Sequence, residues 1–256
     1  MMLTLRDVRA GYGSGDVVKG VSFDVRPGEN LSVIGPNGCG KTTLLRAIAN
    51  VLPFQGDVEL GGKPTRKMKS REIAKKVAML NQMSEIYFSF SVYDTVMMGR
   101  YLHIKDKFLG LPSEEDKAKV TQCLEAVDLL DVAEREITTL SGGQLQRAYL
   151  ARTLAQEPEI ILLDEPTNHL DLKYQIELIE YLRHWAEING CAVIGVMHDL
   201  NLALRLSDRI LVMKDGKAEA LGTAEEILSG ALFEKTYEID AVQYMKDSLK
   251  IWEGVV

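Results

Sequence analysis

The chain has 256 residues, of which 46% are hydrophobic and 26% charged, and its net charge is −7. A chain of this length buries enough apolar surface to fold without disulfides. Nucleic-acid binding relies on clustered Lys and Arg, so the acidic balance argues against a nucleic-acid partner, as well as against electrostatic adhesion to an anionic membrane. No apolar run approaches the roughly 18 residues of a membrane span, so we expect any link to a membrane to run through another polypeptide.

The first third of the chain combines strand patterns with one helix pattern. In chain order, we expect strands at residues 2–9, 16–25, 31–34, 58–60 and 77–80, and a helix over residues 44–49. Gly11, Gly13 and Gly15 punctuate the turn between the first two strands.

Residues 84–156 differ in character, because their apolar positions recur with helical spacing around 92–98 and again around 117–127. Ser113 and Asp116 resemble a capping box at a helix start, with Asp in the place where Glu or Gln is usual. This segment is predicted to be a helical insertion.

Strands and helices alternate in the last third of the chain. We expect strands at residues 160–163 and 192–196, helices at 172–188 and 200–206, and a hairpin of 210–213 with 217–221. This alternation of buried strands and helices implies a largely parallel sheet that is covered on both faces.

The first chemical signal is a phosphate-binding loop, because residues 35–42 match G-x-x-x-x-G-K-[ST] between a predicted strand and a predicted helix. Glycines let backbone N–H groups converge on phosphate oxygens, and the helix directs its positive end at the same charge. Lys41 would reach the β- and γ-phosphates of a nucleotide, and Thr42 would hold Mg²⁺. The alternative is a plain glycine-rich turn. The residues expected to bind the nucleotide here are Gly35, Pro36, Asn37, Gly38, Cys39, Gly40, Lys41, Thr42 and Thr43.

A pair of carboxylates, Asp164 and Glu165, follows the apolar strand at 160–163. Ligands of open α/β sheets bind at the carboxyl ends of the strands. Asp164 suits a role in holding Mg²⁺, and Glu165 suits a base that polarises the attacking water. The alternative is a carboxylate pair that only caps the next helix.

A second anion site is predicted where residues 140–144 open a helix that runs to about residue 156. Ser141 is a fitting N-cap, and Gly142 and Gly143 would let a phosphate approach the helix N-terminus. One phosphoryl group does not need two such loops from one chain, which suggests that the second loop serves a neighbouring molecule.

These three segments, in this order and spacing, resemble the nucleotide-binding subunits of ATP-binding-cassette transporters, and the resemblance covers residues 2–235. It implies an α/β fold: a P-loop NTPase core with a mostly parallel sheet, an N-terminal antiparallel β subdomain and an α-helical insertion subdomain. We therefore expect one domain over residues 1–256, with 1–83 and 157–256 as the ATP-binding core and 84–156 as the helical subdomain. The resemblance also implies ATP hydrolysis with Mg²⁺, in a head-to-tail pair whose ATP lies between the phosphate loop of one copy and segment 140–144 of the other.

The same resemblance assigns roles to single residues. Tyr12 would stack on adenine, although alone it would be read as a surface turn residue. Gln82 would contact Mg²⁺ and sense the membrane domain, and His198 would contact the γ-phosphate. Residues 168–171 would form a loop that crosses the dimer interface. The expected catalytic residues are Lys41, Glu165 and His198; the metal would be held by Thr42, Gln82 and Asp164; the second copy's ATP would be contacted by Ser141, Gly142, Gly143 and Gln144.

Segments 91–101, 113–116 and 198–203 resemble, within that family, the importers of metal chelates: iron siderophores, haem and cobalamin. Leu102 departs from the proline of many members, and residues 104–111 depart from the usual loop. The resemblance implies transmembrane permease subunits, a second copy of the chain and, indirectly, a substrate-binding protein as partners, with the chain at the cytoplasmic face of the cell membrane. Residues 84–110 would carry the groove for the permease's cytoplasmic helix.

Other classes of protein share the phosphate loop. A soluble cassette ATPase of DNA repair would carry a long coiled coil, and one of translation would carry two cassettes in one chain. A P-loop kinase would lack residues 140–144, and a regulatory module that only binds ATP would typically lose Glu165 or His198. The sequence therefore favours transport.

Overall fold

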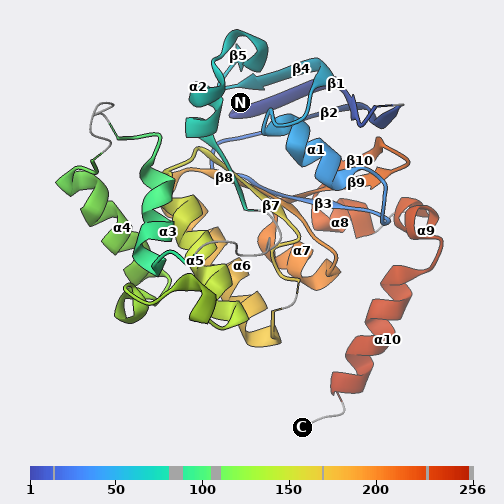
Figure 1. Cartoon of the computed structure of the whole chain (residues 1–256). Coiled ribbons are helices and arrows are strands. Elements are labelled where there is room, and N and C mark those ends of the chain that lie inside the picture. The colour runs from blue at the N-terminus through green and yellow to red at the C-terminus, as the bar shows by residue number, and fades with distance from the viewer. Residues whose placement is uncertain (14, 81–88, 105–110, 169, 229–230, 254–256) are drawn as a thin grey trace.

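The computed structural model describes residues 1–256 except 14, 81–88, 105–110, 169, 229–230 and 254–256 (Figure 1). An antiparallel sheet lies at the top of the view, a larger sheet crosses the middle, and most helices lie below it. This is the α/β arrangement that the sequence predicts. None of the helices in the described part of the chain is long and apolar enough to cross a membrane.

The antiparallel sheet has the strand order β2-β1-β4-β5. Its strands are β1 (Leu3–Gly11), β2 (Asp16–Val25), β4 (Phe54–Leu60) and β5 (Lys63–Pro64). Apolar residues alternate toward one face of β1 at Leu3 and Leu5 and again at Val8 and Ala10, with a register shift between the two pairs at Asp7, whose φ is 45°. The alternation predicted for the first two strands is thus confirmed, and β4 begins four residues earlier than expected.

The central sheet has the order β10-β9-β3-β8-β7-β6. Its strands are β3 (Asn30–Ile34), β6 (Val77–Leu80), β7 (Ile160–Asp164), β8 (Ala192–Val196), β9 (Arg209–Lys214) and β10 (Lys217–Gly222). All neighbours pair in parallel except β9 and β10, which form the expected hairpin. The carboxyl ends of β3, β8, β7 and β6 therefore lie along one edge of the sheet, where ligands bind in such folds.

Two hydrophobic cores lie on opposite faces of this sheet. Along β7, Ile160 and Leu162 point into one core, and Ile161 and Leu163 point into the other. Helix α1 (Lys41–Ile48) packs in the first core, between the two sheets. Because every β7 side chain before Asp164 is buried, the strand reads as a continuous apolar run.

The second core is shared between the central sheet and the predicted helical insertion. The insertion contains α3 (Val92–Met97), η2 (Met98–Arg100), α4 (Glu114–Ala126), η3 (Leu130–Val132), η4 (Ile137–Thr139) and α5 (Gly142–Ala155). Ser113 and Asp116 form the predicted capping box at the start of α4. Since Val92 and Leu150 lie in one cluster with Ile161, the described residues of the insertion continue the core below the sheet.

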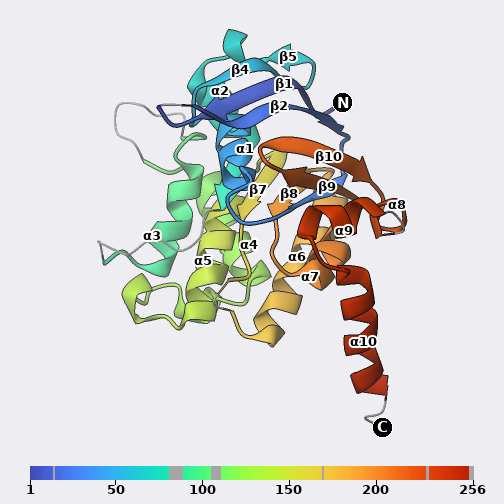
Figure 2. The same cartoon turned by 90° about the vertical axis from the view of Figure 1, so that its right-hand side faces the viewer.

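Of the remaining helices, some were predicted from the sequence and others were not. As predicted, α6 (Leu172–Asn189) and α7 (Leu200–Leu206) flank β8. The structure adds η1 (Thr65–Lys67), α2 (Ser70–Lys76), α8 (Ala224–Leu228), α9 (Ala231–Tyr237) and α10 (Ala241–Glu253), for which no element was expected. Helix α10 extends away from the rest of the chain (Figure 2).

Candidate nucleotide-binding site

The phosphate loop joins β3 to α1 and depends on three glycines with positive φ, namely Gly35 (148°), Gly38 (77°) and Gly40 (104°). At Gly35 a Cβ atom would lie 2.1 Å from the Met213 carbonyl oxygen, so only glycine fits there. Gly40 is the N-cap of α1, and no described side chain caps that end. The first N–H groups of the helix are therefore available to a phosphate. Asn37 and Gly38 are exposed at the tip of the loop, whereas Thr43 is buried in the first turn of α1.

Lys41 is buried and folds back over its own loop. Its Nζ donates to the carbonyl oxygens of Gly35, at 2.8 Å, and Pro36, at 3.0 Å. These two bonds hold the ammonium group inside the curve of the loop, and an ammonium group has three protons to donate. The positive charge is therefore already fixed where the loop would receive phosphate oxygens.

The turn between β9 and β10 supports the phosphate loop from the side. The N–H of Gly216 donates to the Cys39 carbonyl at 3.1 Å, and the Gly216 carbonyl accepts from the N–H of Lys19 at 2.7 Å. A Cβ on Gly216 would lie 2.1 Å from the Val17 carbonyl oxygen. The turn thus fits closely between β2 and the phosphate loop. Burial raises the pKa of the Cys39 thiol, which favours the unreactive protonated form.

Thr42, in the first turn of α1, and Asp164, the last residue of β7, meet at the edge of the sheet. The hydroxyl of Thr42 donates to Asp164 Oδ1 at 2.8 Å. Burial, together with the neighbouring charge of Glu165, raises the pKa of Asp164 although the Thr42 bond lowers it. One hydroxyl and one carboxylate are hard oxygen donors, the kind that Mg²⁺ prefers, and a divalent cation beside them would favour ionised Asp164. The residues present therefore fit Mg²⁺; the third predicted ligand, Gln82, lies outside the described residues.

Glu165 and His198 lie at the ends of the neighbouring strands β7 and β8. The Nε2 atom of His198 is 2.5 Å from Glu165 Oε1, and Asn168 Nδ2 donates to Glu165 Oε2 at 2.6 Å. Glu165 has a φ of 53°, and its N–H donates to the Val196 carbonyl at 3.1 Å. Both carboxylate oxygens and the backbone are thus held, so the side chain is fixed at the mouth of the site.

Tyr12 follows β1 and lies beside the phosphate helix. Its hydroxyl accepts a hydrogen bond from Arg46 Nη1 of α1 at 2.7 Å, while 51% of the residue remains exposed. The ring is therefore anchored at one end and open on its surface, as a stacking platform for an aromatic base requires.

The segment at the start of α5 is not part of the group of residues around the phosphate loop. Ser141 Oγ accepts from the Gln144 N–H at 3.3 Å, and Gln144 Oε1 accepts from the Ser141 N–H at 3.1 Å. This confirms the predicted N-cap and shows that Gln144 completes a capping box. Ser141 and Gly142 are exposed, whereas Gly143 packs against the Tyr174 ring.

The structure thus sorts the predicted residues into two groups. Lys41, Thr42, Asp164, Glu165 and His198 converge at the carboxyl ends of β3, β7 and β8. The segment at the start of α5 belongs to the other core, on the opposite face of the central sheet from α1. The sequence places Asn168 only in the interface loop, although it contacts Glu165 three residues earlier. It gives no role to Gly216, whose bond to Cys39 joins segments that are far apart in the chain.

Comparison with known proteins agrees with this geometry. A family model described as "ABC transporter" matches residues 18–168. The chain is 38% identical over 239 residues to the achromobactin transport ATP-binding protein CbrD of Dickeya dadantii, covering 93% of this chain and 88% of that protein. It is 37% identical to the ferric enterobactin transport ATP-binding protein FepC of Escherichia coli, covering 89% and 83%.

Two solved structures are similar in fold. A metal-chelate type ABC transporter in an inward-facing conformation superposes with a TM-score of 0.80 at 29% identity, covering 93% of this chain and 88% of that chain. The dimeric ATP-binding cassette MJ0796, bound to ADP and phosphate, superposes with a TM-score of 0.76 at 29% identity, covering 87% and 98%.

The chain belongs to the ABC transporter family. Within that family it is an ATP-binding subunit, an ATPase with the P-loop NTPase fold.

Proposed function

We propose that the chain is the ATP-hydrolysing subunit of an importer of a metal chelate, and that it works as a head-to-tail homodimer with Mg²⁺ at the cytoplasmic face of the cell membrane. The proposal of a dimer is supported by the separate locations, within one chain, of the two predicted anion sites. The phosphate loop and the exposed start of α5 belong to opposite faces of the central sheet. A second copy turned head to tail would bring its own Ser141–Gln144 segment to the ATP that this copy holds. The dimeric MJ0796 cassette supports the pairing.

The chemistry assigned to this chain uses the converged group of residues. The phosphate-loop N–H groups and Lys41 would hold the β- and γ-phosphates of ATP, and Tyr12 would stack on adenine. Thr42, Asp164 and Gln82 would hold Mg²⁺, which supplies charge stabilisation to the phosphoryl group when bound. Glu165 would orient and polarise the attacking water, and His198 would donate to the γ-phosphate.

Closure and opening of the dimer follow from what each γ-phosphate contacts. While ATP is bound, its γ-phosphate would be held by Lys41 of one copy and by Ser141 of the other. Hydrolysis and release of phosphate remove that shared contact, so the two copies separate. The cycle of closure and opening is the mechanical output that a permease would use.

The proposed cargo and partners rest on the relatives. CbrD and FepC are ATP-binding proteins of achromobactin and ferric enterobactin transport, and a metal-chelate type transporter is similar in structure. We therefore assign a metal chelate as cargo, transmembrane permease subunits as direct partners and a substrate-binding protein as an indirect one. The insertion beside α3 would receive the permease's cytoplasmic helix.

The decisive experiment is purification of the tagged chain from gently solubilised native membranes, followed by mass spectrometry of what comes with it. We expect a multi-span permease, whose binding protein would then narrow the chelate. A chain that is found free of any membrane protein, or bound to nucleic-acid factors, would refute transport while leaving the ATPase chemistry intact.

A further inference from the structure

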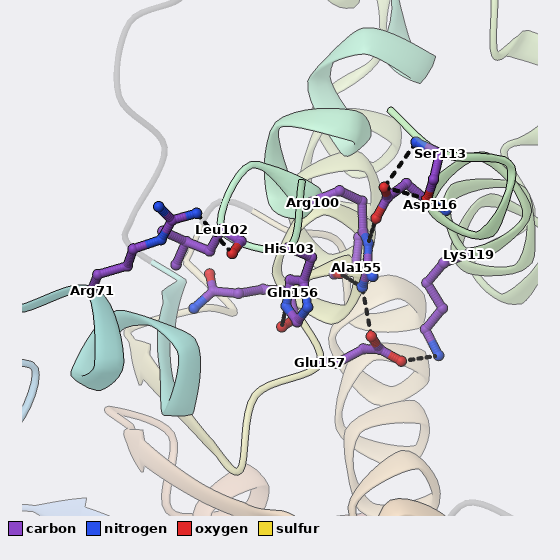
Figure 3. A network of polar contacts seen from close by, with 10 residues as sticks. All are labelled: Arg71, Arg100, Leu102, His103, Ser113, Asp116, Lys119, Ala155, Gln156 and Glu157. Atoms are coloured by element: carbon purple, nitrogen blue, oxygen red, sulfur yellow. Dashed lines mark hydrogen bonds and ion pairs between the residues drawn. The ribbon is translucent and has the colours of Figure 1, made fainter. Parts of the chain in front are cut away.

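An ion-pair network around the buried Arg100 joins the insertion to the segment that leads into β7 (Figure 3). Arg100 ends η2, and its side chain is only 4% exposed. Its Nε donates to Asp116 Oδ1 at 2.9 Å, and its Nη1 donates to Glu157 Oε2 at 2.6 Å. Lys119 Nζ lies 3.0 Å from the other oxygen of Glu157. One guanidinium thus connects η2, α4 and the connection that leads into β7.

The same guanidinium closes the end of α5. Arg100 Nη1 donates to the carbonyl of Ala155, the last residue of that helix, at 2.7 Å. His103 Nε2 lies 2.9 Å from the next carbonyl oxygen, that of Gln156. Terminal carbonyls of a helix lack partners within the helix, and a cation there interacts favourably with the helix dipole. Two side chains from beyond α3 therefore hold the C-terminal end of α5.

Backbone packing shows that this attachment is close. A Cβ on Gly99 would lie 2.2 Å from the Arg152 carbonyl oxygen and 3.0 Å from the Ala155 Cβ. The side chain of Gln156 adds an anchor on the other side, because its Nε2 donates to the Val77 carbonyl at 3.2 Å. The C-terminal end of α5 is thus fixed both to η2 and to the start of β6.

Asp116 fixes the far side of the network. Its Oδ2 accepts from the N–H of Ser113 at 3.0 Å and from the Ser113 hydroxyl at 2.7 Å, while Oδ1 accepts from Arg100. Burial opposes ionisation, but the bonds from Ser113 and Arg100 lower the pKa of Asp116 overall. The carboxylate is therefore charged and buried, and it loses its cationic partner if Arg100 is replaced by a neutral residue.

The other end of α5 carries the predicted contact to a second copy. The helix spans 14 residues, so its ends are about 21 Å apart at 1.5 Å per residue, and a tilt of about 5° would move its first turn by about 2 Å. We propose that Arg100 is a positioning residue for ATP hydrolysis: by fixing the C-terminal end of α5, it places the Ser141–Gln144 segment on the ATP held by the second copy. This inference rests on the proposed head-to-tail dimer.

The position of the network predicts which step depends on it. Arg100 and its partners lie on η2 and α4, at the end of α5 and at residue 157, whereas the phosphate loop joins β3 to α1. ATP binding by a single copy should therefore be insensitive to Arg100, while ATP-driven dimerisation and turnover should depend on it. A residue that only stabilises the fold would lower the melting temperature without separating these two readouts.

The test uses the full chain with Arg100→Gln and Arg100→Lys. Affinity for a fluorescent ATP analogue is measured on dilute protein, and the ATP concentration for half-maximal dimerisation is measured by light scattering in the Glu165→Gln background. We expect the dissociation constant of Arg100→Gln for the analogue to stay within about twofold of the parent value. The ATP concentration for half-maximal dimerisation should rise by at least about tenfold, as expected for the loss of hydrogen bonds to charged groups. The turnover of Arg100→Gln with Glu165 intact should fall by a similar factor. Arg100→Lys should show a smaller loss than Arg100→Gln, because lysine keeps the positive charge but lacks the planar set of donors of a guanidinium group.

Lys117→Gln is the matched control, since Lys117 forms an exposed ion pair with Glu114 on α4 outside the network. Glu157→Gln, which removes a half-exposed partner without leaving a buried charge, should give an intermediate loss of dimerisation. Equal dimerisation of Arg100→Gln and the parent would overturn the inference, as would parallel loss of analogue binding. If the parent itself stays monomeric in ATP, the proposed dimer fails, and this inference fails with it.

Discussion

His198 Nε2 lies 2.5 Å from Oε1 of Glu165, although 33 positions separate the two residues in the chain. The contact exists because β7 and β8 are parallel neighbours, so that the residues following them meet at one edge of the sheet. The pair therefore joins the proposed base directly to the proposed γ-phosphate contact.

Replacing Glu165 by Gln should lower turnover strongly while preserving ATP binding. The amide keeps the size of the side chain but cannot act as a base, and general-base catalysis contributes about 10²–10⁴-fold. Phosphate release under saturating ATP measures the loss, and light scattering should show a persistent dimer in ATP. Glu187→Gln, an exposed carboxylate on α6, is the control. Turnover within about threefold of the parent would remove Glu165 from the base role.

Replacing Asp164 by Asn should stabilise the protein when neither nucleotide nor Mg²⁺ is added. Because burial raises the pKa of Asp164 in the folded state, its ionisation opposes folding at neutral pH. The gain in melting temperature should be greatest near pH 7, shrink as pH falls through the raised pKa, and vanish below the ordinary carboxyl range, about 3.9.

Thermal unfolding between pH 3.5 and 8, on a scale that brackets these pKa values, measures this difference, and Asp131→Asn controls for the loss of one exposed charge. When Mg²⁺ and ATP are added, the parent should have the higher melting temperature, since only the parent keeps the Asp164 carboxylate that would bind the cation. A stability difference that is the same at every pH would contradict the assignment.

Replacing Gly216 by Ala should weaken ATP binding, although Gly216 is not one of the residues expected to contact the nucleotide. The new Cβ would meet the Val17 carbonyl oxygen at 2.1 Å, so the turn must withdraw and release the bond from its N–H to Cys39. Gly28→Ala is a matched control, because Gly28 has a similar φ of 74° but open space around the added atom. Both variants carry the cost of a positive φ, about 1–2 kcal/mol. Equal analogue affinity for the two would show that the turn does not support the phosphate loop.

Replacing Phe233 by Ala should destabilise the chain by about 3–5 kcal/mol, the usual range for a buried aromatic. Phe233 is 1% exposed and lies in the core below the central sheet, against Tyr237, whose pKa burial raises to about 12. Urea unfolding measures the change. Leu249→Ala on α10 is the control, since that side chain is 60% exposed and should change the unfolding free energy by no more than about 0.5 kcal/mol. Similar losses for both would mean that α9 adds little to the core.

Much of this fold could be predicted from the sequence, because its central elements are locally consistent. The β7 run and the glycine loop after β3 each carry a pattern within a few residues. The capping box at Ser113 is likewise predicted by neighbouring residues, and the structure confirms it. The ATP-binding family follows from the same short segments.

The missed elements depend on contacts between distant segments. Only Ile73 is buried in α2, so that helix has no apolar stripe to recognise. Helix α9 is seven residues long, too short to be stable alone, and it exists because Phe233 fits a core built by other segments. The bonds of Lys41 to its own loop and the close fit of Gly216 likewise appear only in three dimensions. The domain limits at 83 and 157 and the roles of the site residues stay predictions.

Strand β3 leads into the phosphate loop near the start of the chain, yet its two neighbours, β8 and β9, are made of residues 192–196 and 209–214. At a ribosomal rate of about 5–20 residues per second, they leave the ribosome roughly 10–40 s after β3 does. The pairing of β1 with β2 and β4 needs no such delay. Until residues 192–214 have emerged, a nascent chain should therefore present a formed antiparallel sheet above an unassembled nucleotide site. During that time it would depend on chaperones or rapid elongation to keep apolar β3 from pairing with the wrong strand.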